Sequence, residues 1–526
     1  FMKFQKIIII VILFLFSGSN GFSKEIKKYL IKFKPNILFS QAVVNLENSG
    51  FKLEKYLKEI DVYIVNLENS KLLKSNAAFL KENTLYIEKD SILKAFLAPN
   101  DTYYVDQKEI QRIQIEQAWD LSLGSKDVVL AVVDTGYTFN HIDLKDQVWT
   151  NPKPDTEGDY INDIHGWDFV GNDNDPTDEN NPGHGTHVSG IIGALGNNAA
   201  GIAGINFQTS IMPLRFLDKN GEGYNSNAVK AIIYAANHGA RLINASWGGG
   251  SADQSLLDAI LYAYDKGTLL IAAAGNEVNN NDKSPMYPAS YDTFGVLTVA
   301  SSEGEGTLSS FSNFGLLSVD LVAPGSNILS TVPPNDWKRL SGTSMAAPHI
   351  TGIGGLILSL SPSLSVKDLR NAILNSVYER SKYQNNISTH GDVSAYLALN
   401  QLGAGFQVWP ARITIKKGST YPFTAYQASG VVQWSVSPAT LASISTDGVL
   451  NAQSDGDVTV IAKDATGNIA STISVGIRTQ ESNGGGGGCS KNNNKPDPSL
   501  PNQAGAALSF TLPFFVGFLL RRRRTR

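Results

Sequence analysis

Residues Val128–Gly136 read V-V-L-A-V-V-D-T-G, an unbroken apolar run that ends in Asp134. Two further runs of this kind follow, Leu242–Ala245 before Ser246 and Leu269–Ala274 before Asn276. Short apolar runs that alternate with helical patterns are typical of a parallel sheet covered on both faces. Ligands of such sheets bind at the carboxyl ends of the strands. We therefore expect Asp134, Ser246 and Asn276 to lie along one functional edge.

Two glycine-flanked stretches place further polar residues at predicted helix starts. Gly183–Gly190 reads G-H-G-T-H-V-S-G and precedes an apolar run, so His184 begins a helix and His187 lies about one turn later. Leu340–Thr351 reads L-S-G-T-S-M-A-A-P-H-I-T, and helix formers at helical spacing place Ser344 at a helix N-terminus. Backbone N–H groups there favour developing negative charge, which suits a nucleophilic serine. The simpler alternative for such a serine is a helix N-cap.

The close spacing of His184 and His187 also raises the question of a metal site. Zinc hydrolases that bind their metal through two histidines of one helix require a glutamate in the same motif, and this stretch has none. We therefore expect His187 to be a packed, hydrogen-bonded histidine.

Length and composition limit the domain number, the class of partner and the presence of disulfides. The 526 residues are too many for a single domain, and a net charge of −4 gives no indication of a nucleic-acid partner. The one cysteine, Cys489, lies in the C-terminal tail. The folded part is therefore expected to be stabilised by packing or by bound ions rather than by disulfides.

The N-terminal region has the features of an exported protein. Residues 2–22 have a basic start, an apolar run and a small polar end, which predicts a signal peptide. A membrane anchor is the alternative, for which the apolar run is short. Residues 23–98 predict a compact α+β module, either a propeptide or a stable accessory domain, ahead of the large domain at residues 101–402.

The composition changes again after the large domain. Residues 406–478 alternate valine, threonine and glycine between turn residues, which predicts an all-β sandwich with Trp434 as its core aromatic. Residues 482–503 form a Gly- and Asn-rich spacer. Residues 504–526 combine an apolar segment with four arginines and predict a short membrane segment with a basic stop; a disordered tail is the alternative.

Asp134, His184 and Ser344 supply the three groups of serine nucleophilic catalysis. A histidine takes the proton of the weakly nucleophilic hydroxyl, and an aspartate orients and stabilises the imidazolium. The order Asp, His, Ser is that of subtilisin. Three motifs, A-V-V-D-T-G, H-G-T-H-V-S-G and G-T-S-M-A-A-P-H, resemble those of the subtilisin-like serine proteases (subtilases, peptidase family S8) over about residues 101–402.

This resemblance implies an α/β domain of three layers with a mainly parallel central sheet, and a serine endopeptidase activity. It implies that Asn276, in A-A-A-G-N, donates to an oxyanion beside the Ser344 backbone N–H; a plain turn asparagine is the alternative. It also implies that extended substrate pairs with two backbone segments, represented by Gly221, Gly223, Ser246, Trp247 and Gly248. Trp247 replaces a smaller apolar residue near the primary pocket and either narrows that pocket or points elsewhere.

The resemblance further implies bound calcium, for which loop oxygens are suitable ligands. The first expected site consists of the Asp143 and Asn198 side chains and the carbonyls of Gly196, Ala200 and Ile202, with Asp101 as an additional ligand. The second consists of Asp168, Asp173 and Asp175, for which a solvated acidic loop is the alternative.

The flanking regions carry resemblances of their own. Residues 23–98 resemble the inhibitory propeptide of the family, which occupies the cleft and is cut off by the enzyme itself. Residues 406–478 resemble bacterial immunoglobulin-like modules of type 2. The tail is similar to C-terminal sorting signals of Gram-negative secreted proteins, which implies an intramembrane sorting protease as partner and a lipid on Cys489.

The sequence thus predicts a secreted, calcium-dependent serine endopeptidase that processes itself and acts on polypeptides in extended form. Attachment to the cell surface or outer membrane through the tail is an option that this prediction leaves open. The alternative is a catalytically idle surface protein that binds or adheres through its immunoglobulin-like domain.

Overall fold

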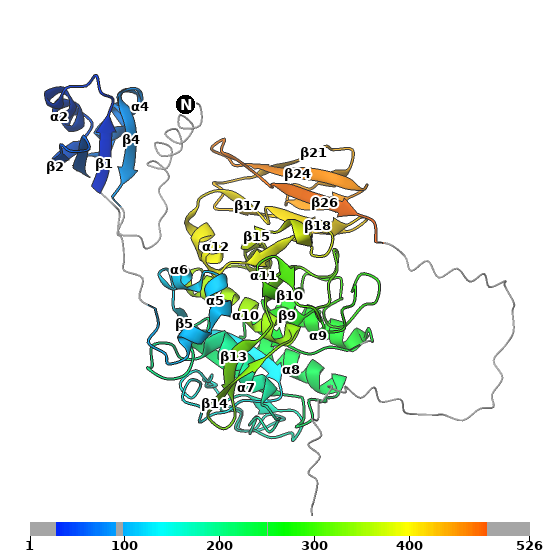
Figure 1. Cartoon of the computed structure of the whole chain (residues 1–526). Helices are drawn as coiled ribbons and strands as arrows, with labels where there is room; N and C mark the ends of the chain where they lie inside the picture. Colours follow the sequence, from blue (N-terminus) through cyan, green and yellow to red (C-terminus); the bar gives the residue numbers. More distant parts are fainter. Residues whose placement is uncertain (1–27, 91–97, 250, 481–526) are drawn as a thin grey trace, which may run out of the picture. The chain divides into compact units, whose positions relative to one another are not determined.

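The computed structural model describes residues 28–90, 98–249 and 251–480 (Figure 1). The predicted signal peptide, the Gly- and Asn-rich spacer with Cys489, and the terminal apolar segment therefore lie outside the described residues. Of the helices that are described, none is both long and apolar enough to cross a bilayer.

The N-terminal α+β domain (residues 28–89) is an antiparallel sheet in the order β2-β3-β1-β4, with three helices. Its elements are β1 (Lys28–Phe33), α2 (Phe39–Asn48), β2 (Phe51–Leu57), β3 (Val62–Leu67), α3 (Ser70–Ser75), α4 (Ala77–Asn83) and β4 (Thr84–Lys89). Tyr29, Ile31 and Phe33 alternate along β1 toward the interior, where they pack with Leu46 of α2. The domain thus has a hydrophobic core of its own. The α+β fold predicted for this module is confirmed.

The large domain is built on a ten-stranded sheet with the main path β15-β16-β12-β10-β9-β8-β5-β7-β6. Its strands are β5 (Gly124–Asp134), β6 (Trp167–Asp168), β7 (Gln208–Arg215), β8 (Leu242–Ala245), β9 (Leu269–Ala273), β10 (Val296–Gly304), β11 (Thr307–Leu308), β12 (Leu321–Pro324), β15 (Val377–Glu379) and β16 (Gly391–Val393). All neighbours pair in parallel except β15 with β16 and β11 with β10. The apolar runs predicted as strands are confirmed as β5, β8 and β9.

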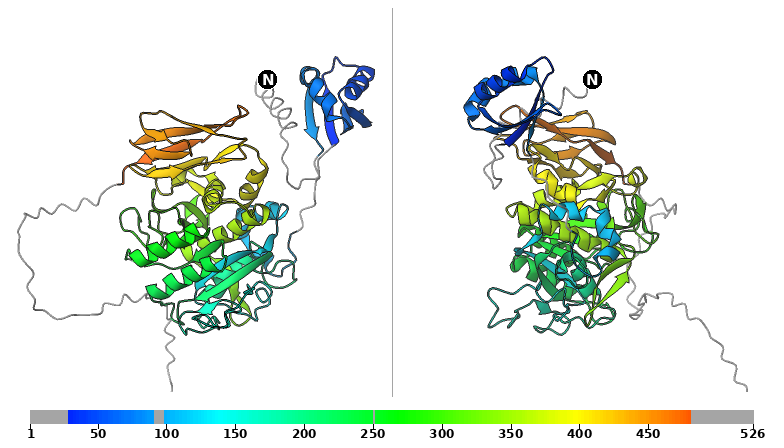
Figure 2. Two further views of the ribbon diagram at one scale, coloured as in Figure 1. Left: turned by 180° about the vertical axis from the view of Figure 1, so that it is seen from behind. Right: turned by 60° about the vertical axis from the view of Figure 1, so that its left-hand side comes forward.

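Helices cover both faces of this sheet, as the continuous apolar runs predict. They are α5 (Lys108–Arg112), α6 (Ile115–Trp119), α7 (His184–Gly193), α8 (Asn225–Asn237), α9 (Gln254–Asp265), α10 (Thr343–Leu360), α11 (Val366–Leu374) and α12 (Ala395–Asn400), with the 3-10 turns η1 (Tyr104–Asp106), η2 (Ser381–Tyr383) and η3 (Gln401–Gly403). Leu130 and Val132 of β5 pack with α10, whereas Ala131 and Val133 pack with α8 and α9. The α8 and α9 helices lie side by side in both Figure 1 and the left view of Figure 2. The predicted three-layer α/β architecture is confirmed.

A separate hairpin of β13 (Ile328–Val332) and β14 (Asp336–Leu340) leads directly into α10. Helix α7 packs against β13 and also against α10. Ser344 is the second residue of α10, so the path of β14 determines where the chain enters the helix that carries the predicted nucleophile.

The C-terminal β-domain (residues 407–478) contains three small sheets with the strand orders β18-β26-β24-β21, with β25 paired to β24, then β19-β23-β22, and β17-β20. The strands are β17 (Gln407–Trp409), β18 (Arg412–Lys416), β19 (Thr420–Pro422), β20 (Thr424–Tyr426), β21 (Gln433–Ser437), β22 (Ala442–Ile444), β23 (Val449–Ala452), β24 (Gly456–Lys463), β25 (Ile469–Ser471) and β26 (Ser474–Arg478). The prediction of Trp434 as core aromatic is wrong. Trp434 lies on the terminal strand β21 and is only partly buried, whereas Trp409 and Phe423 are fully buried.

The core of the C-terminal β-domain is continuous with that of the large domain. Leu369 and Ile373 of α11 belong to the same buried cluster as Trp409 and Phe423. Polar contacts reinforce this junction, because Tyr421 Oη donates to Asn371 Oδ1 at 2.8 Å. The two domains therefore share one interior.

The Arg370 guanidinium lies at the centre of this junction. Arg370 Nη2 donates to Asp320 Oδ1 at 2.9 Å, and Nη1 donates to Tyr421 Oη at 3.0 Å. The Arg370 side chain is 8% exposed and also lies over the rings of Phe294 and Tyr421. The junction therefore contains a buried ion pair in addition to its apolar contacts.

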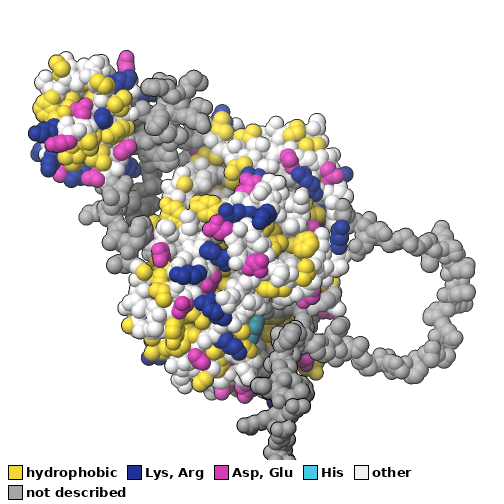
Figure 3. Space-filling view, viewed as in Figure 1, with side chains coloured by type: hydrophobic (Ala, Val, Ile, Leu, Met, Phe, Trp, Pro, Cys, Tyr) yellow, Lys and Arg dark blue, Asp and Glu magenta, His cyan; other side chains and the backbone are white. Residues whose placement is uncertain are grey.

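Charged side chains are mixed on the surface. On the face drawn in Figure 3, Lys and Arg side chains are interspersed with Asp and Glu side chains, in keeping with a net charge of −4.

We predict that Arg370→Ala lowers the free energy of unfolding by about 3–5 kcal/mol, because it leaves Asp320 partly buried without its countercharge. Denaturant unfolding measures the change. Arg478→Ala is the matched control, since it breaks an exposed pair with Asp457 that contributes about 0–1 kcal/mol. Equal effects of the two substitutions would contradict a structural role for the buried pair.

Candidate active site

Asp134 ends β5 at the carboxyl edge of the sheet, as predicted. Its side chain is 0% exposed, and its Oδ1 accepts hydrogen bonds from the Thr135 backbone N–H and from His184 Nδ1, both at 2.7 Å. A buried carboxylate in contact with Nδ1 fixes the ring orientation and leaves Nε2 as the free nitrogen of His184.

His184 is the first residue of α7, and Gly183 precedes it with a φ of 91°. Asp178 holds this helix start, because its Oδ2 accepts from the Thr186 backbone N–H at 2.9 Å and from the Thr186 hydroxyl at 2.7 Å. Burial lowers the pKa of His184, but the charge of Asp134 and the hydrogen bond to it outweigh burial. The pKa of His184 is therefore raised above its usual value, which suits a general base that must hold a proton transiently.

Ser344 is held at the start of α10 by a reciprocal pair of hydrogen bonds with Ser246. The Ser344 hydroxyl donates to the Ser246 carbonyl at 3.0 Å, and the Ser246 hydroxyl donates to the Ser344 carbonyl at 2.8 Å. Within the described ranges, no hydrogen bond joins Ser344 to His184 directly. Nucleophile–base hydrogen bonds are often long or unformed in unliganded sites and tighten when substrate binds.

Asn276 lies beside this helix start with its amide orientation fixed. Its Oδ1 accepts from the Thr343 backbone N–H at 2.8 Å and from the Thr343 hydroxyl at 3.1 Å. Because the oxygen is occupied, Nδ2 is the end of the carboxamide that is available as a donor. Asn276 is exposed, so this donor can reach a ligand at the helix N-terminus.

Sequence reasoning missed the threonines that connect these residues. The Thr135 hydroxyl accepts from the Gly185 backbone N–H at 2.8 Å, and the Thr343 hydroxyl accepts from the Gly275 N–H at 3.1 Å. A signal was present, because each of the three motifs contains a threonine next to or near its predicted catalytic residue. Each threonine ties its own motif to a second motif or to the helix cap.

The two segments predicted to bind substrate are both close to other backbone. A Cβ on Gly223 would overlap the Phe216 carbonyl, and a Cβ on Gly248 would lie 3.0 Å from the Tyr287 carbonyl. Gly221 has a φ of 78° in the turn that Asp218 closes. The absence of a Cβ at Gly223 and Gly248 is therefore required by the protein's own backbone, and the roles of these glycines in substrate binding stay predictions.

Trp247 is fixed rather than free to move over the cleft. Its Nε1 donates to the Val133 carbonyl at 2.8 Å, and its ring meets Phe216 edge-on with a centroid distance of 4.8 Å. The indole thus packs on the sheet face covered by α8 and α9, whereas the Ser246 hydroxyl points to α10.

His187 is buried and hydrogen-bonded as predicted, since its Nε2 contacts the Lys338 carbonyl at 2.9 Å. Burial lowers the pKa of His187 to about 3. A neutral His187 therefore persists at every pH at which His184 titrates.

Of the ligands predicted for the first calcium site, the Asn198 side chain and the Ile202 backbone contact Asp143, Ile202 through its N–H rather than its carbonyl. Asp143 is fully buried and accepts from Asn198 Nδ2 at 2.8 Å, from the Ile202 backbone N–H at 3.0 Å and from Trp337 Nε1 at 2.7 Å. The nearby Asp101 is 4% exposed, and burial, with a smaller contribution from the charge of Asp143, raises its pKa. No ion pair with either carboxylate is found among the described residues. Two buried carboxylates without a countercharge are suited to binding a cation. A rotation of the Asn198 carboxamide by about 180° would replace Nδ2 by Oδ1 and supply a further oxygen ligand.

The second predicted calcium site is not supported. In the described parts of the chain, no group of three or more His, Cys, Asp or Glu side chains is placed to hold a metal, and the three aspartates of this predicted site therefore do not form one; the first site has only two carboxylates. Asp168 is instead paired with Arg215, whose Nη1 lies 2.7 Å from Asp168 Oδ2. Asp175 accepts a hydrogen bond from the Thr177 hydroxyl at 2.5 Å. The buried Arg215 guanidinium thus neutralises Asp168, which the prediction had assigned to calcium. The sequence pattern did not reveal this ion pair.

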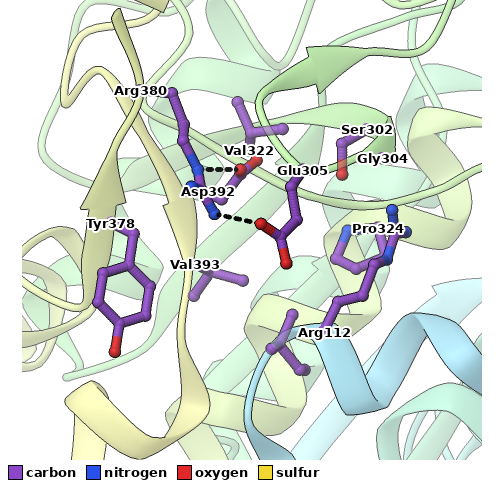
Figure 4. A pocket seen from close by; sticks show the side chains of 11 residues that line it. Arg112, Ser302, Gly304, Glu305, Val322, Pro324, Tyr378, Arg380, Asp392 and Val393 are labelled. Carbon is purple, nitrogen blue, oxygen red and sulfur yellow. Dashed lines mark hydrogen bonds and ion pairs between the residues drawn. The ribbon is translucent and has the colours of Figure 1, made fainter.

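A separate pocket lies where β10, β12 and β16 end (Figure 4). Arg380 crosses it and pairs with Asp392 at 2.9 Å and with Glu305 at 3.5 Å. None of the predicted site residues lines this pocket, so it is distinct from the candidate active site.

Comparisons with known proteins agree with this geometry. A family model described as "Subtilase family" matches residues 125–403, which is more than half of the chain. Thermitase of Thermoactinomyces vulgaris is 41% identical over 302 residues, covering 57% of this chain and 99% of the relative. A thermophilic serine proteinase of Bacillus sp. (strain AK1) is 43% identical over 275 residues, covering 52% of this chain and 63% of the relative, which is under two thirds of its length.

The solved structures include a protease from Pseudoalteromonas arctica PAMC 21717 that is 29% identical. It covers 58% of this chain and 99% of its own length, with a TM-score of 0.50. The similarity supports the arrangement of the central sheet and its helices.

We predict that the rate at which phenylmethylsulfonyl fluoride labels Ser344 rises with pH through an apparent pKa above about 6.5, because only neutral His184 accepts the serine proton. Asp134→Asn removes the charge that raises the pKa, so it should shift the midpoint to lower pH and reduce the plateau by orders of magnitude. Labelling rates across pH measure both effects. An unchanged midpoint in Asp134→Asn would contradict the assigned electrostatic coupling.

Proposed function

The chain belongs to the subtilase family of serine proteases, and from this premise we propose that it cleaves peptide bonds through an acyl-enzyme on Ser344. The observation that carries the proposal is the 2.7 Å contact between His184 and the buried Asp134, at the edge of the sheet where α10 presents Ser344. An oriented imidazole, a serine hydroxyl at a helix N-terminus and a free amide donor are the parts that acyl transfer requires.

The proposed reaction proceeds in two halves. His184 takes the proton of the Ser344 hydroxyl as Oγ attacks the scissile carbonyl carbon, and Asp134 stabilises the imidazolium. The Ser344 backbone N–H and Asn276 Nδ2 donate to the oxyanion that forms. His184 then gives its proton to the leaving amine, and water hydrolyses the ester by the same route. A single oxyanion donor is worth about 10²–10³ in turnover, a range known from a subtilisin.

We propose that the N-terminal α+β domain is an inhibitory propeptide that the enzyme removes. Its separate core supports folding as a unit, and its surface exposes apolar side chains that a docking partner would cover. The exposed residues include Leu38, Phe39, Val44 and Ile60. The proposed cleavage region near residues 94–101 lies largely outside the described residues.

Secretion and sorting of the protein are proposed from the sequence alone. The signal peptide, the Gly-rich spacer with Cys489 and the arginine-rich end all lie outside the described residues. An immunoglobulin-like role for the C-terminal β-domain is likewise a proposal, supported by its all-β composition.

We predict that Ser344→Ala abolishes self-processing, so that the protein retains residues 23–98 and is no longer labelled by a serine-directed reagent. Mass spectrometry of the purified protein measures the termini, and wild-type protein provides the control. Normal maturation of the variant in a protease-free host would contradict self-processing. A mature wild-type protein that resists labelling would favour the alternative of an idle scaffold that binds through its C-terminal domain.

We further propose that calcium binds at Asp143, Asn198 and Asp101 with carbonyls of the same loop, where it would neutralise two buried carboxylates. A ligand present at 100 times its Kd stabilises the folded state by about 2.7 kcal/mol. We predict that chelation lowers Tm of the wild type and that Asp143→Asn removes most of this difference. Asp282→Asn, which changes a carboxylate bonded to Leu317 and Ser318, is the matched control. An identical Tm of the wild type with calcium and with chelator would contradict the proposal.

A further inference from the structure

Four successive residues of the β13–β14 hairpin are each hydrogen-bonded to the segments that carry the other two catalytic groups. Asn335 Oδ1 accepts from the Ile142 backbone N–H at 2.7 Å. The next three residues, Asp336, Trp337 and Lys338, make one such bond each. The partners come from the loop His141–Asp143, which follows Asp134, and from α7, which begins at His184. The hairpin is thus fastened to both segments along its second strand.

Two buried imidazoles hold alternate carbonyls of β14. His141 Nδ1 accepts from the Asp143 backbone N–H at 3.1 Å, so its Nε2 carries the proton and donates to the Asp336 carbonyl at 3.0 Å. His187 Nε2 donates to the Lys338 carbonyl at 2.9 Å. Both rings are 0% exposed, so water cannot replace these bonds without opening the interior.

Trp337 lies between these two carbonyls and points its indole N–H at the buried Asp143. Its Nε1 donates to Asp143 Oδ2 at 2.7 Å. Its ring meets Tyr103 and His141 edge-on, with centroid distances of 5.3 and 5.2 Å. A charge-assisted bond in a partly buried setting is among the stronger hydrogen bonds available to a side chain.

We propose that Trp337, together with His141 and His187, positions Ser344 relative to His184 by clamping β14 to the loop after Asp134 and to α7. The inference rests on the proposed function of Ser344. Ser344 lies only six positions after Lys338 in the chain, so the clamp fixes the entry of the chain into α10. Ser344 itself is bonded to Ser246 rather than to His184, and the approach of nucleophile and base therefore depends on this surrounding frame.

Misplacement of reacting groups by about 1 Å can cost about 10²-fold in rate. Loosening β14 should therefore lower turnover without weakening substrate binding, because the segments predicted to pair with substrate are elsewhere. Burial and the charge and hydrogen bond of Asp134 determine the pKa of His184, and a looser β14 should leave that pKa unchanged. In the pH dependence of the Ser344 labelling rate, we therefore expect a lower plateau and an unchanged midpoint.

The test compares Trp337→Phe with Trp119→Phe in mature enzyme. Trp119, the last residue of α6, is a matched control because its Nε1 also donates one bond in the core, to the Ile205 carbonyl at 2.9 Å. The measurements are kcat and KM for a short peptide, the rate of Ser344 labelling by phenylmethylsulfonyl fluoride across pH, and Tm. For Trp337→Phe we expect kcat and the labelling plateau to fall about 10–100-fold with KM and the midpoint unchanged. For Trp119→Phe we expect a lower Tm with kcat near that of the wild type.

A second pair of variants separates positioning from folding if Trp337→Phe does not accumulate. His187→Gln retains an N–H that can donate to the Lys338 carbonyl, whereas His187→Leu does not. We expect Gln to rescue kcat and Leu to lower it while both proteins stay folded. The proposal is overturned if folded Trp337→Phe keeps the wild-type kcat, if Trp119→Phe loses kcat to the same extent, or if Gln and Leu have equal effects. Labelling of wild-type Ser344 tests the proposed function separately, since it does not depend on the clamp.

Discussion

The hydrogen bond between Asp134 and His184 is the interaction on which the rest of the site depends. A carboxylate that is 0% exposed is costly to bury unless its charge is compensated, so its position at the end of a central strand demands a partner. The glycines before and after His184 let α7 begin close enough to provide that partner. Helix α7, the hairpin and α10 are then arranged around a base whose orientation is already determined.

The nucleophile is organised differently, through backbone and small polar side chains. Ser246 exchanges two hydrogen bonds with Ser344, and Thr343 fixes the carboxamide of Asn276. These contacts come from loops that follow β8 and β9, and in the parallel sheet β8 pairs with β5 and β9 pairs with β8. The open parallel sheet therefore gathers residues distant in sequence at one edge, as expected from its topology.

Local patterns in the sequence were sufficient for the strands β5, β8 and β9 and for the helix starts at His184 and Ser344. Contacts between distant segments were not predictable, because nothing near Trp337 indicates that its indole meets Asp143. Arg370 lies on α11 within a pattern that is compatible with a solvated helix face, yet it is buried against Asp320 and Tyr421. Similarly, the acidic loop was predicted to bind calcium because no countercharge lies near it in the sequence. The countercharge of Asp168 is Arg215, which lies 47 residues later on β7.

The shared interior of the large domain and the C-terminal β-domain affects how well the junction between them resists proteolytic cleavage. Proteases cut extended, accessible chain, and junctions between domains are the usual targets. Here the connection between η3 and β17 consists of residues 404–406, of which Ala404 is exposed and the other two are half-buried. The two domains are therefore joined without an exposed hinge, which would protect this junction from the proteolytic activity proposed for the chain.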